Sequence, residues 1–223
     1  MELFARPEWQ MAPGERAAIA GVLAELRPAL SIELGTAQGG SLRTIAAYSD
    51  EVHSFDFAPE VENPPANVTL HVGDSHELLP KLLASLAAAG KNVDFALVDG
   101  DHSAEGVRRD VVDLLDSPAV TDTVIVLHDA ANAQVRAGVD AAAPERHPKV
   151  RLLDLAFVEL QRPAAVLMEE WGGLGLIVVG PDDGTPRVVR NLRRPQSLAR
   201  QAAVPARAAI RRGHRAARRR GWI

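Results

Sequence analysis

The stretch SIELGTAQGGS (residues 31–41) decides the fold. It joins a short apolar strand, an acidic residue, a glycine turn and a run of helix-forming residues. A second acidic residue, Asp56, follows fifteen residues after the end of this stretch. A glycine turn between a strand and a helix is typical of α/β proteins that bind a ligand at the carboxyl ends of their strands.

Strand and helix patterns alternate around this turn. The predicted helices cover residues 12–28, 41–49, 74–90 and 104–117. The predicted strands cover residues 29–34, 51–57, 67–73, 93–100 and 122–130. Such alternation indicates a parallel sheet with helices on both faces. Two later apolar segments, 150–160 and 173–180, have no strong helix pattern between them and predict an antiparallel closing hairpin. We therefore expect a doubly wound, mostly parallel, seven-stranded sheet of the Rossmann-like kind.

Composition divides the chain into a body and a tail. The 223 residues, 47% of them hydrophobic, are enough for one domain with a sizeable core. From Arg187 onward there are twelve Arg and no Asp or Glu, whereas residues 1–186 carry 13 Lys and Arg against 29 Asp and Glu. We expect an acidic globular domain over residues 1–186 and a basic Ala/Arg-rich tail over residues 187–223.

The sequence also limits compartment and chemistry. No run reaches the roughly 18 apolar residues of a membrane span, and the first ten residues lack the pattern of a signal peptide. We therefore expect a cytoplasmic protein. Because there is no cysteine, a metal would have to be held by oxygen or imidazole.

Polar residues and glycine gather at five predicted strand ends. In open α/β sheets the carboxyl ends of the strands meet at the ligand site, and seven such positions are hard to assign to packing. They are Glu33, Gly35, Asp56, Asp74, Asp99, His128 and Asp129.

The acidic residue at the turn favours one ligand. Glu33 would repel the pyrophosphate of a dinucleotide, and ELGTAQGG is not the G-x-G-x-x-G pattern. Carboxylates at Glu33 and Asp56 instead suit the ammonium, sulfonium and ribose hydroxyls of S-adenosylmethionine. A nicotinamide-dependent oxidoreductase is the alternative from a different class.

On these motifs the chain resembles the class I S-adenosylmethionine-dependent methyltransferases, from about Ser31 to Asp129. The resemblance implies that the turn holds the methionine portion through Glu33, Gly35, Thr36, Gly39 and Ser41. It further implies that Asp56 holds the ribose, and that the adenine is edged by Gly73, Asp74 and Ser75.

The next two strand ends predict a metal site. Ends of neighbouring strands lie roughly 5 Å apart, so Asp99 and Asp129 can share a divalent cation such as Mg²⁺. A bound cation would lower the pKa of an acceptor hydroxyl, and His102, three residues after Asp99, is the candidate base. These features predict an O-methyltransferase.

The pattern is similar to the metal-dependent O-methyltransferases of sugar and natural-product tailoring, the macrolide-sugar and cephalosporin group. Their Asp-x-x-His segment, a metal ligand and the base, matches Asp99 and His102. This chain departs from the pattern at His128, where the family has an acidic residue. Either His128 is a nitrogen ligand that favours Mn²⁺, or the protein supplies fewer ligands.

The acceptor and the tail remain open. A low aromatic content, 4%, favours a sugar or glycoside hydroxyl over a small phenol or catechol, with Trp171 as a stacking surface. The Ala- and Arg-rich usage fits an actinobacterial source of methylated glycans, such as methylmannose polysaccharides. Enzymes of this group often associate, so a homo-oligomer is an open alternative. The tail could be a solvated extension, a membrane anchor or a nucleic-acid contact, and we favour the first.

Overall fold

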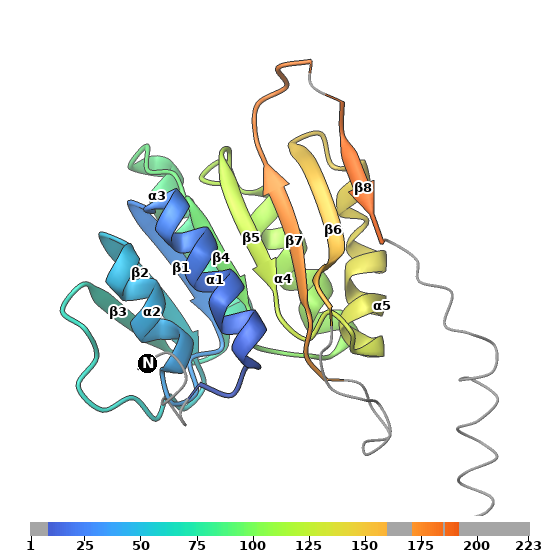
Figure 1. The fold of residues 1–223 in the computed structure, drawn as a ribbon. Helices are drawn as coiled ribbons and strands as arrows, with labels where there is room; N and C mark the ends of the chain where they lie inside the picture. Colours follow the sequence, from blue (N-terminus) through green and yellow to red (C-terminus); the bar gives the residue numbers. More distant parts are fainter. Residues whose placement is uncertain (1–8, 160–170, 185, 192–223) are drawn as a thin grey trace, which may run out of the picture. The chain divides into compact units, whose positions relative to one another are not determined.

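The computed structural model describes residues 9–159, 171–184 and 186–191. Its centre is one eight-stranded sheet in the order β3-β2-β1-β4-β5-β7-β6-β8 (Figure 1). The strands are β1 (Leu30–Leu34), β2 (Glu51–Asp56), β3 (Val68–Val72), β4 (Phe95–Val98), β5 (Thr123–Leu127), β6 (Val150–Val158), β7 (Leu174–Val179) and β8 (Val188–Arg190). Only β7 runs against its neighbours β5 and β6.

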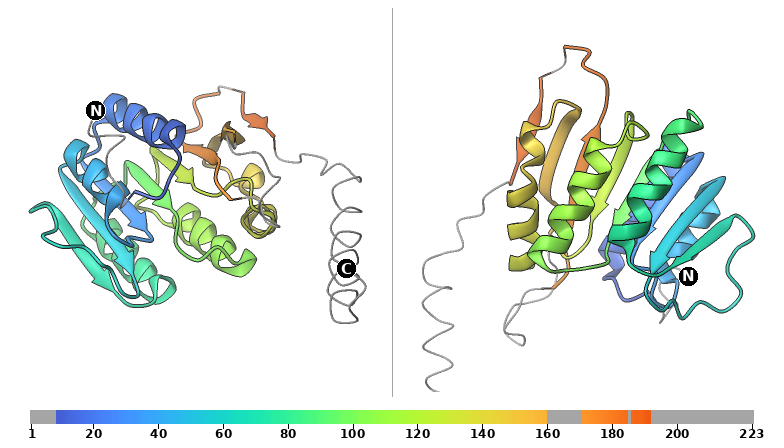
Figure 2. Two further views of the ribbon diagram at one scale, coloured as in Figure 1. Left: turned by 60° about the horizontal axis from the view of Figure 1, so that its bottom comes forward. Right: turned by 180° about the vertical axis from the view of Figure 1, so that it is seen from behind.

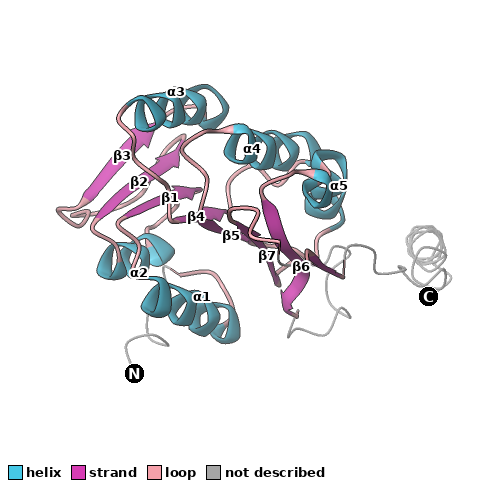
Figure 3. Ribbon diagram, turned by 90° about the horizontal axis from the view of Figure 1, so that it is seen from above, coloured by secondary structure: helices cyan, strands magenta, loops and turns pink. Residues whose placement is uncertain are grey.

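Helices cover both faces of the sheet, as predicted. They are α1 (Pro13–Leu26), α2 (Gly40–Tyr48), α3 (Ser75–Ala88), α4 (Ala104–Asp116), α5 (Ala133–Ala142) and the short 3-10 helix η2 (Pro144–Arg146). Helices α1 and α2 lie on one face and α3, α4 and α5 on the other (Figures 2 and 3). The prediction of a doubly wound, mostly parallel sheet with an antiparallel hairpin is confirmed.

The central strands consist mostly of apolar residues because they are buried on both faces. All residues of β1 and β4 are buried, because helices cover both of their faces. One core cluster, with Phe55 and Leu114, joins the sheet to α3, α4 and α5, and a second, with Ile19 and Phe95, joins it to α1 and α2. The sheet is thus a rigid support for the loops at its edge.

Two features differ from the sequence-based expectation. An eighth strand, β8, pairs in parallel with β6, so the sheet reaches Arg190, beyond the domain limit expected at residue 186. Residues 133–142 form α5, a helix that the sequence patterns did not predict, and it packs on α4 so closely that a Cβ at Gly138 would lie 2.6 Å from the carbonyl oxygen of Ala104. Both features depend on contacts between distant segments, which local periodicity does not carry.

Most residues of the predicted basic tail are not among those that the structure describes. Residues 192–223 of the basic tail, for which three roles were considered, lie outside the described residues, as do residues 160–170. Among the helices that the structure describes, none is long and apolar enough to cross a membrane.

Candidate functional site

The candidate site lies where the direction of chain travel across the sheet reverses. From β1 the chain adds β2 and β3 on one side, then crosses back to add β4 and β5 on the other. The carboxyl ends of β1 and β4 therefore lie at the switch point of the sheet, the usual ligand position in open α/β sheets. This end of the parallel strands is the lower edge in Figure 1.

The glycine turn after β1 has to be narrow. Gly35 has a φ of 90°, and a Cβ built on it would lie 2.2 Å from the carbonyl oxygen of Asp99. Gly39, with a φ of 80°, precedes the first residue of α2. Glycine at position 35 therefore lets the turn press against the end of β4.

We expect Gly35→Ala to destabilise the protein by about 2 kcal/mol or more. The added Cβ combines an unfavourable φ with a clash against backbone that cannot rotate away. Chemical denaturation would measure the loss, and Gly21→Ala, where a Cβ meets nothing within 4 Å, is the matched control. Equal effects of the two substitutions would contradict the close approach of the turn to Asp99.

Glu33 lies under the turn rather than at its surface. Its side chain is 0% exposed, and its carboxyl oxygens accept hydrogen bonds of 2.6 Å from the hydroxyls of Ser41 and Ser54. Burial raises the pKa of this carboxyl to about 8, although the two hydroxyls lower it. Thr36 is also turned inward, with its hydroxyl 2.5 Å from that of Ser54. Contacts of Glu33, Thr36 and Ser41 with a cofactor stay predictions.

Asp56 closes the turn from the side of β2. Its Oδ2 accepts hydrogen bonds from the backbone N–H of Thr36 at 3.0 Å and of Ala37 at 2.8 Å. Its carbonyl accepts one from the N–H of Gly73 at 2.9 Å, which brings the segment after β3 alongside. Asp56 thus joins the turn after β1 to the segment after β3, and its contact with a ribose stays a prediction.

The segment Gly73, Asp74 and Ser75 begins α3. Asp74 is the N-cap, and its side chain accepts a hydrogen bond from the backbone N–H of His76 at 2.9 Å. The side chain of Asp74 is still 39% exposed, so a further contact at the edge of an adenine stays a prediction.

The predicted metal-site residues come together. Asp99, His102, His128 and Asp129 each offer one ligand atom, and these atoms all lie within 4.8 Å of one another. Nδ1 of His128 lies 2.7 Å from Asp99 Oδ1 and 3.4 Å from Asp129 Oδ2. Nε2 of His102 lies 3.0 Å from Asp129 Oδ2 and 3.3 Å from Asp99 Oδ1. Two carboxylates and two imidazoles thus converge at the ends of β4 and β5.

Mutual attraction shifts the pKa values in this cluster. Hydrogen bonds to Asp129 and Asp99 raise the pKa of His102 to about 9. Burial lowers the pKa of His128, but Asp99, Asp129 and Glu15 outweigh it and raise that pKa to about 12. Burial likewise raises the pKa of Asp129, but His102 and His128 hold it well below its usual range. Without a cation, two imidazolium groups therefore balance the carboxylates.

Glu15 is a site residue that the sequence patterns did not indicate. It is 2% exposed, and its Oε2 lies 3.6 Å from Nε2 of His128. Its other oxygen accepts a hydrogen bond from the backbone N–H of Gly173. The sequence shows Glu15 only as an acidic residue in the first turn of a helix, and nothing there indicates a partner more than a hundred residues away.

Trp171 is a partly exposed aromatic residue beside the cluster. Its side chain is 40% exposed, and its ring meets the His102 ring edge-on at 5.5 Å between centroids. The next residue, Gly172, donates its backbone N–H to Asp129 Oδ1. The segment that carries Trp171 is therefore attached to the cluster itself.

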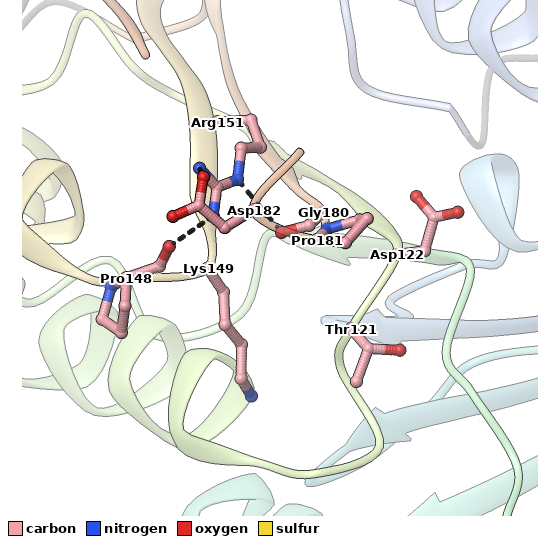
Figure 4. Close-up of a pocket in the computed structure, with 8 residues that line it drawn as sticks. All are labelled: Thr121, Asp122, Pro148, Lys149, Arg151, Gly180, Pro181 and Asp182. Carbon is pink, nitrogen blue, oxygen red and sulfur yellow. Dashed lines mark hydrogen bonds and ion pairs between the residues drawn. The ribbon is translucent and has the colours of Figure 1, made fainter. Parts of the chain in front are cut away.

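A pocket of about 520 Å³ lies at the opposite end of the sheet (Figure 4). It is lined by residues just before β5, around the start of β6 and just after β7. Its Lys149 and Arg151 already make hydrogen bonds within the protein. Lys149 donates to the carbonyls of Leu115 and Ser117 at the end of α4. Since ligands of open α/β sheets bind at the carboxyl ends of the strands, we assign this pocket no part in the site.

Comparison with known proteins shows what part of the chain resembles a known family. A family model described as a methyltransferase domain matches residues 32–130, a range that contains every site residue predicted from the sequence. A comparison with curated proteins found no significant match.

Solved structures of O-methyltransferases share the fold. A putative O-methyltransferase from Klebsiella pneumoniae is 16% identical, with a TM-score of 0.55 over 79% of this chain and 84% of that chain. An O-methyltransferase from Bacillus cereus, in complex with SAH, is 14% identical, with a TM-score of 0.55 over 79% and 86%. The MycE methyltransferase of the mycinamycin pathway, in complex with Mg, SAH and mycinamycin VI, is 17% identical, with a TM-score of 0.51 over 82% and 55%.

The chain has the Rossmann-like α/β fold of methyltransferases, and its residues 32–130 match a methyltransferase domain. The prediction of a methyltransferase is confirmed by the matched domain.

Proposed function

We propose that the protein transfers a methyl group from S-adenosylmethionine to a hydroxyl oxygen of a sugar or glycoside, with the help of a divalent cation. The observation that carries this proposal is the cluster of Asp99, His102, His128 and Asp129 beside the glycine turn. It combines groups that can hold a cation with a group that can accept a proton, next to the expected position of the cofactor.

The donor set fits a divalent cation. Carboxylate oxygens of Asp99 and Asp129 suit Mg²⁺ or Mn²⁺, and an imidazole nitrogen from His128 shifts the preference toward Mn²⁺. A bound cation would supply positive charge that stabilises the deprotonated acceptor hydroxyl. The roles of Asp99, His128 and Asp129 as ligands are part of this proposal.

His102 is the proposed base. Its Nε2 faces both carboxylates. An acceptor hydroxyl beside the cluster would therefore lie near this nitrogen and could pass its proton to it. With a pKa of about 9, His102 is protonated at neutral pH while it pairs with Asp99 and Asp129. Occupation of those carboxylates by a cation would free His102 to lose that proton, which links the base to the cation.

The cofactor assignment rests on the turn and its acidic neighbours. S-adenosylmethionine supplies an electrophilic methyl group on a sulfonium, and its adenosine fits beside Asp56 and the segment after β3, which one hydrogen bond joins. Two solved structures of the same fold are complexes with SAH. These observations support S-adenosylmethionine, rather than a dinucleotide, as the cofactor.

The proposed acceptor is based on Trp171, which lies beside the cluster. Trp171 is the exposed aromatic ring that meets His102, and a ring face beside a base can hold the apolar face of a sugar. The MycE methyltransferase, from the mycinamycin biosynthetic pathway, is in complex with mycinamycin VI. A small phenol or catechol is the competing acceptor.

Calorimetric titration of metal-stripped protein tests the proposal. We expect S-adenosylmethionine to bind in the micromolar range and NAD⁺ not to bind, and Mn²⁺ to bind to the wild type but not to Asp99→Ala/Asp129→Ala. Methyl transfer from labelled cofactor to glycosides, with and without EDTA, then compares sugars with catechols. Binding of NAD⁺ alone would refute the methyltransferase proposal. Transfer that EDTA leaves unchanged would refute the role of the cation, and faster transfer to catechols would refute the sugar.

A further inference from the structure

Glu15 has an environment that a helix cap does not explain. Its Oε2 accepts a hydrogen bond from the backbone N–H of Ala12 at 2.6 Å, which is one half of a capping box at the start of α1, since Ala12 has no side-chain oxygen for the other half. Such caps lie at helix ends, where water is available. Glu15 is instead 2% exposed, and burial of a carboxylate is costly unless other groups compensate it.

Part of the compensation comes from the candidate metal site, beside two backbone N–H donors. Nε2 of His128 is buried and has no hydrogen-bond partner, and the carboxylate that faces it, at 3.6 Å, is Glu15. On the other side of the same ring, Nδ1 lies 2.7 Å from Asp99. The backbone N–H of His128 donates to the carbonyl of Val98 at 3.0 Å, so the main chain is fixed as well.

Glu15 also reaches the segment that borders the site. Its Oε1 accepts a hydrogen bond from the N–H of Gly173, whose carbonyl accepts one of 3.1 Å from Ala130. One carboxylate thus connects α1, the end of β5 and the start of β7. These three elements meet on one side of the cluster.

We infer that Glu15 is a positioning residue that holds the His128 imidazole with Nε2 toward α1 and Nδ1 toward Asp99 and Asp129. Metal-binding histidines usually have such a partner on the second nitrogen, which fixes the proton there and leaves the first nitrogen free for the cation. The cation is part of the proposed function, so the inference rests on it in that respect. The orientation of the ring by Glu15 can be tested without a metal.

Glu15→Gln is the informative substitution. It keeps the size of the side chain but removes the negative charge that faces Nε2 and one acceptor of the cap. We expect Mn²⁺ to bind about 10 to 100 times more weakly, the usual loss for an outer partner of a ligand. Glu25→Gln, at an exposed position of the same helix, is the matched control and should leave the affinity unchanged.

A double-mutant cycle separates positioning from a general structural effect. If Glu15 acts through His128, Glu15→Gln should alter Mn²⁺ affinity less than about 2-fold in a His128→Ala background. An equal loss in both backgrounds would overturn the inference, as would an unchanged affinity in the single variant. Titrations of the full chain by electron paramagnetic resonance provide these numbers, and circular dichroism checks that each variant is folded.

Nuclear magnetic resonance of the ¹⁵N-labelled histidine rings gives a readout that does not depend on the proposed function. In metal-free protein the ring shifts of His128 should change in Glu15→Gln and not in Glu25→Gln. If the wild type binds no Mn²⁺, the proposed cation fails, and this comparison alone supports or overturns the role of Glu15. If Glu15→Gln does not fold, Zn²⁺-loaded wild type decides: His128 should keep its proton on Nε2 and lose the one on Nδ1, and the reverse pattern would overturn the inference.

Discussion

Asp129→Asn should destabilise the protein by about 3 kcal/mol at pH 7 and abolish metal binding. The carboxylate of Asp129 is 6% exposed and pairs with His102 at 3.0 Å and with His128 at 3.4 Å. Removing one partner of a buried ion pair leaves the other charge uncompensated, which typically costs 3 to 5 kcal/mol. We take the lower value because Asp99 still faces both histidines.

The pH dependence of this loss has a defined sign. Since the pKa of Asp129 is lowered on folding, its stabilisation is present above the unfolded pKa of about 3.9 and disappears as the pH falls through the folded value. The difference between wild type and Asp129→Asn should therefore shrink below about pH 4. Asp122→Asn, at the exposed opposite end of β5, is the control.

Urea denaturation at several pH values measures the stability difference, and calorimetry measures Mn²⁺ binding. The loss of affinity should exceed 100-fold, because even outer partners of ligands cost about 10 to 100 times. A variant as stable as Asp122→Asn at pH 7, or one that binds Mn²⁺ normally, would contradict the place of Asp129 in the cluster.

Glu33→Gln should have the opposite effect and stabilise the metal-free, cofactor-free protein. The folded-state pKa of Glu33 is about 8, whereas the ordinary value is 4.5, so between these values the folded protein holds a proton that the unfolded chain releases. The free energy of unfolding therefore falls with rising pH by about 1.4 kcal/mol per pH unit over this window. Glutamine imitates the protonated carboxyl and does not titrate. The variant should be more stable than the wild type by roughly 4 kcal/mol at pH 8, and equal to it below about pH 4.5.

The same substitution, Glu33→Gln, should weaken cofactor binding although it stabilises the free protein. If Glu33 contacts the ammonium of S-adenosylmethionine as predicted, its charge is required in the complex, and Glu33→Gln should weaken binding by about 10-fold or more. Denaturation at pH 5 and pH 8 and calorimetry with the cofactor measure the two effects, with Glu25→Gln as control. A pH-independent difference in stability would show that Glu33 is not protonated in the folded protein. A stabilised variant with unchanged cofactor affinity would restrict Glu33 to packing under the turn.

Local patterns carried most of the fold and the outline of the site. The alternating elements, the Asp74 cap and the hairpin follow from residue periodicity and turn residues, because hydrogen bonding within a helix or at its end involves neighbours in sequence. The meeting of Asp99 with His128 could also be predicted. Once two parallel strands are neighbours, the register places their carboxyl ends side by side.

The sequence by itself determined the doubly wound fold, the glycine turn and the gathering of Asp99, His102, His128 and Asp129 at one edge. Only the tertiary structure decided that Glu33 is enclosed between Ser41 and Ser54, and that Glu15 of α1 faces His128. Strand ends are positioned by the regular geometry of the sheet, whereas the burial of a carboxylate and its choice of partner depend on how a helix packs from a distant part of the chain. That packing is non-local, and no spacing in the sequence records it.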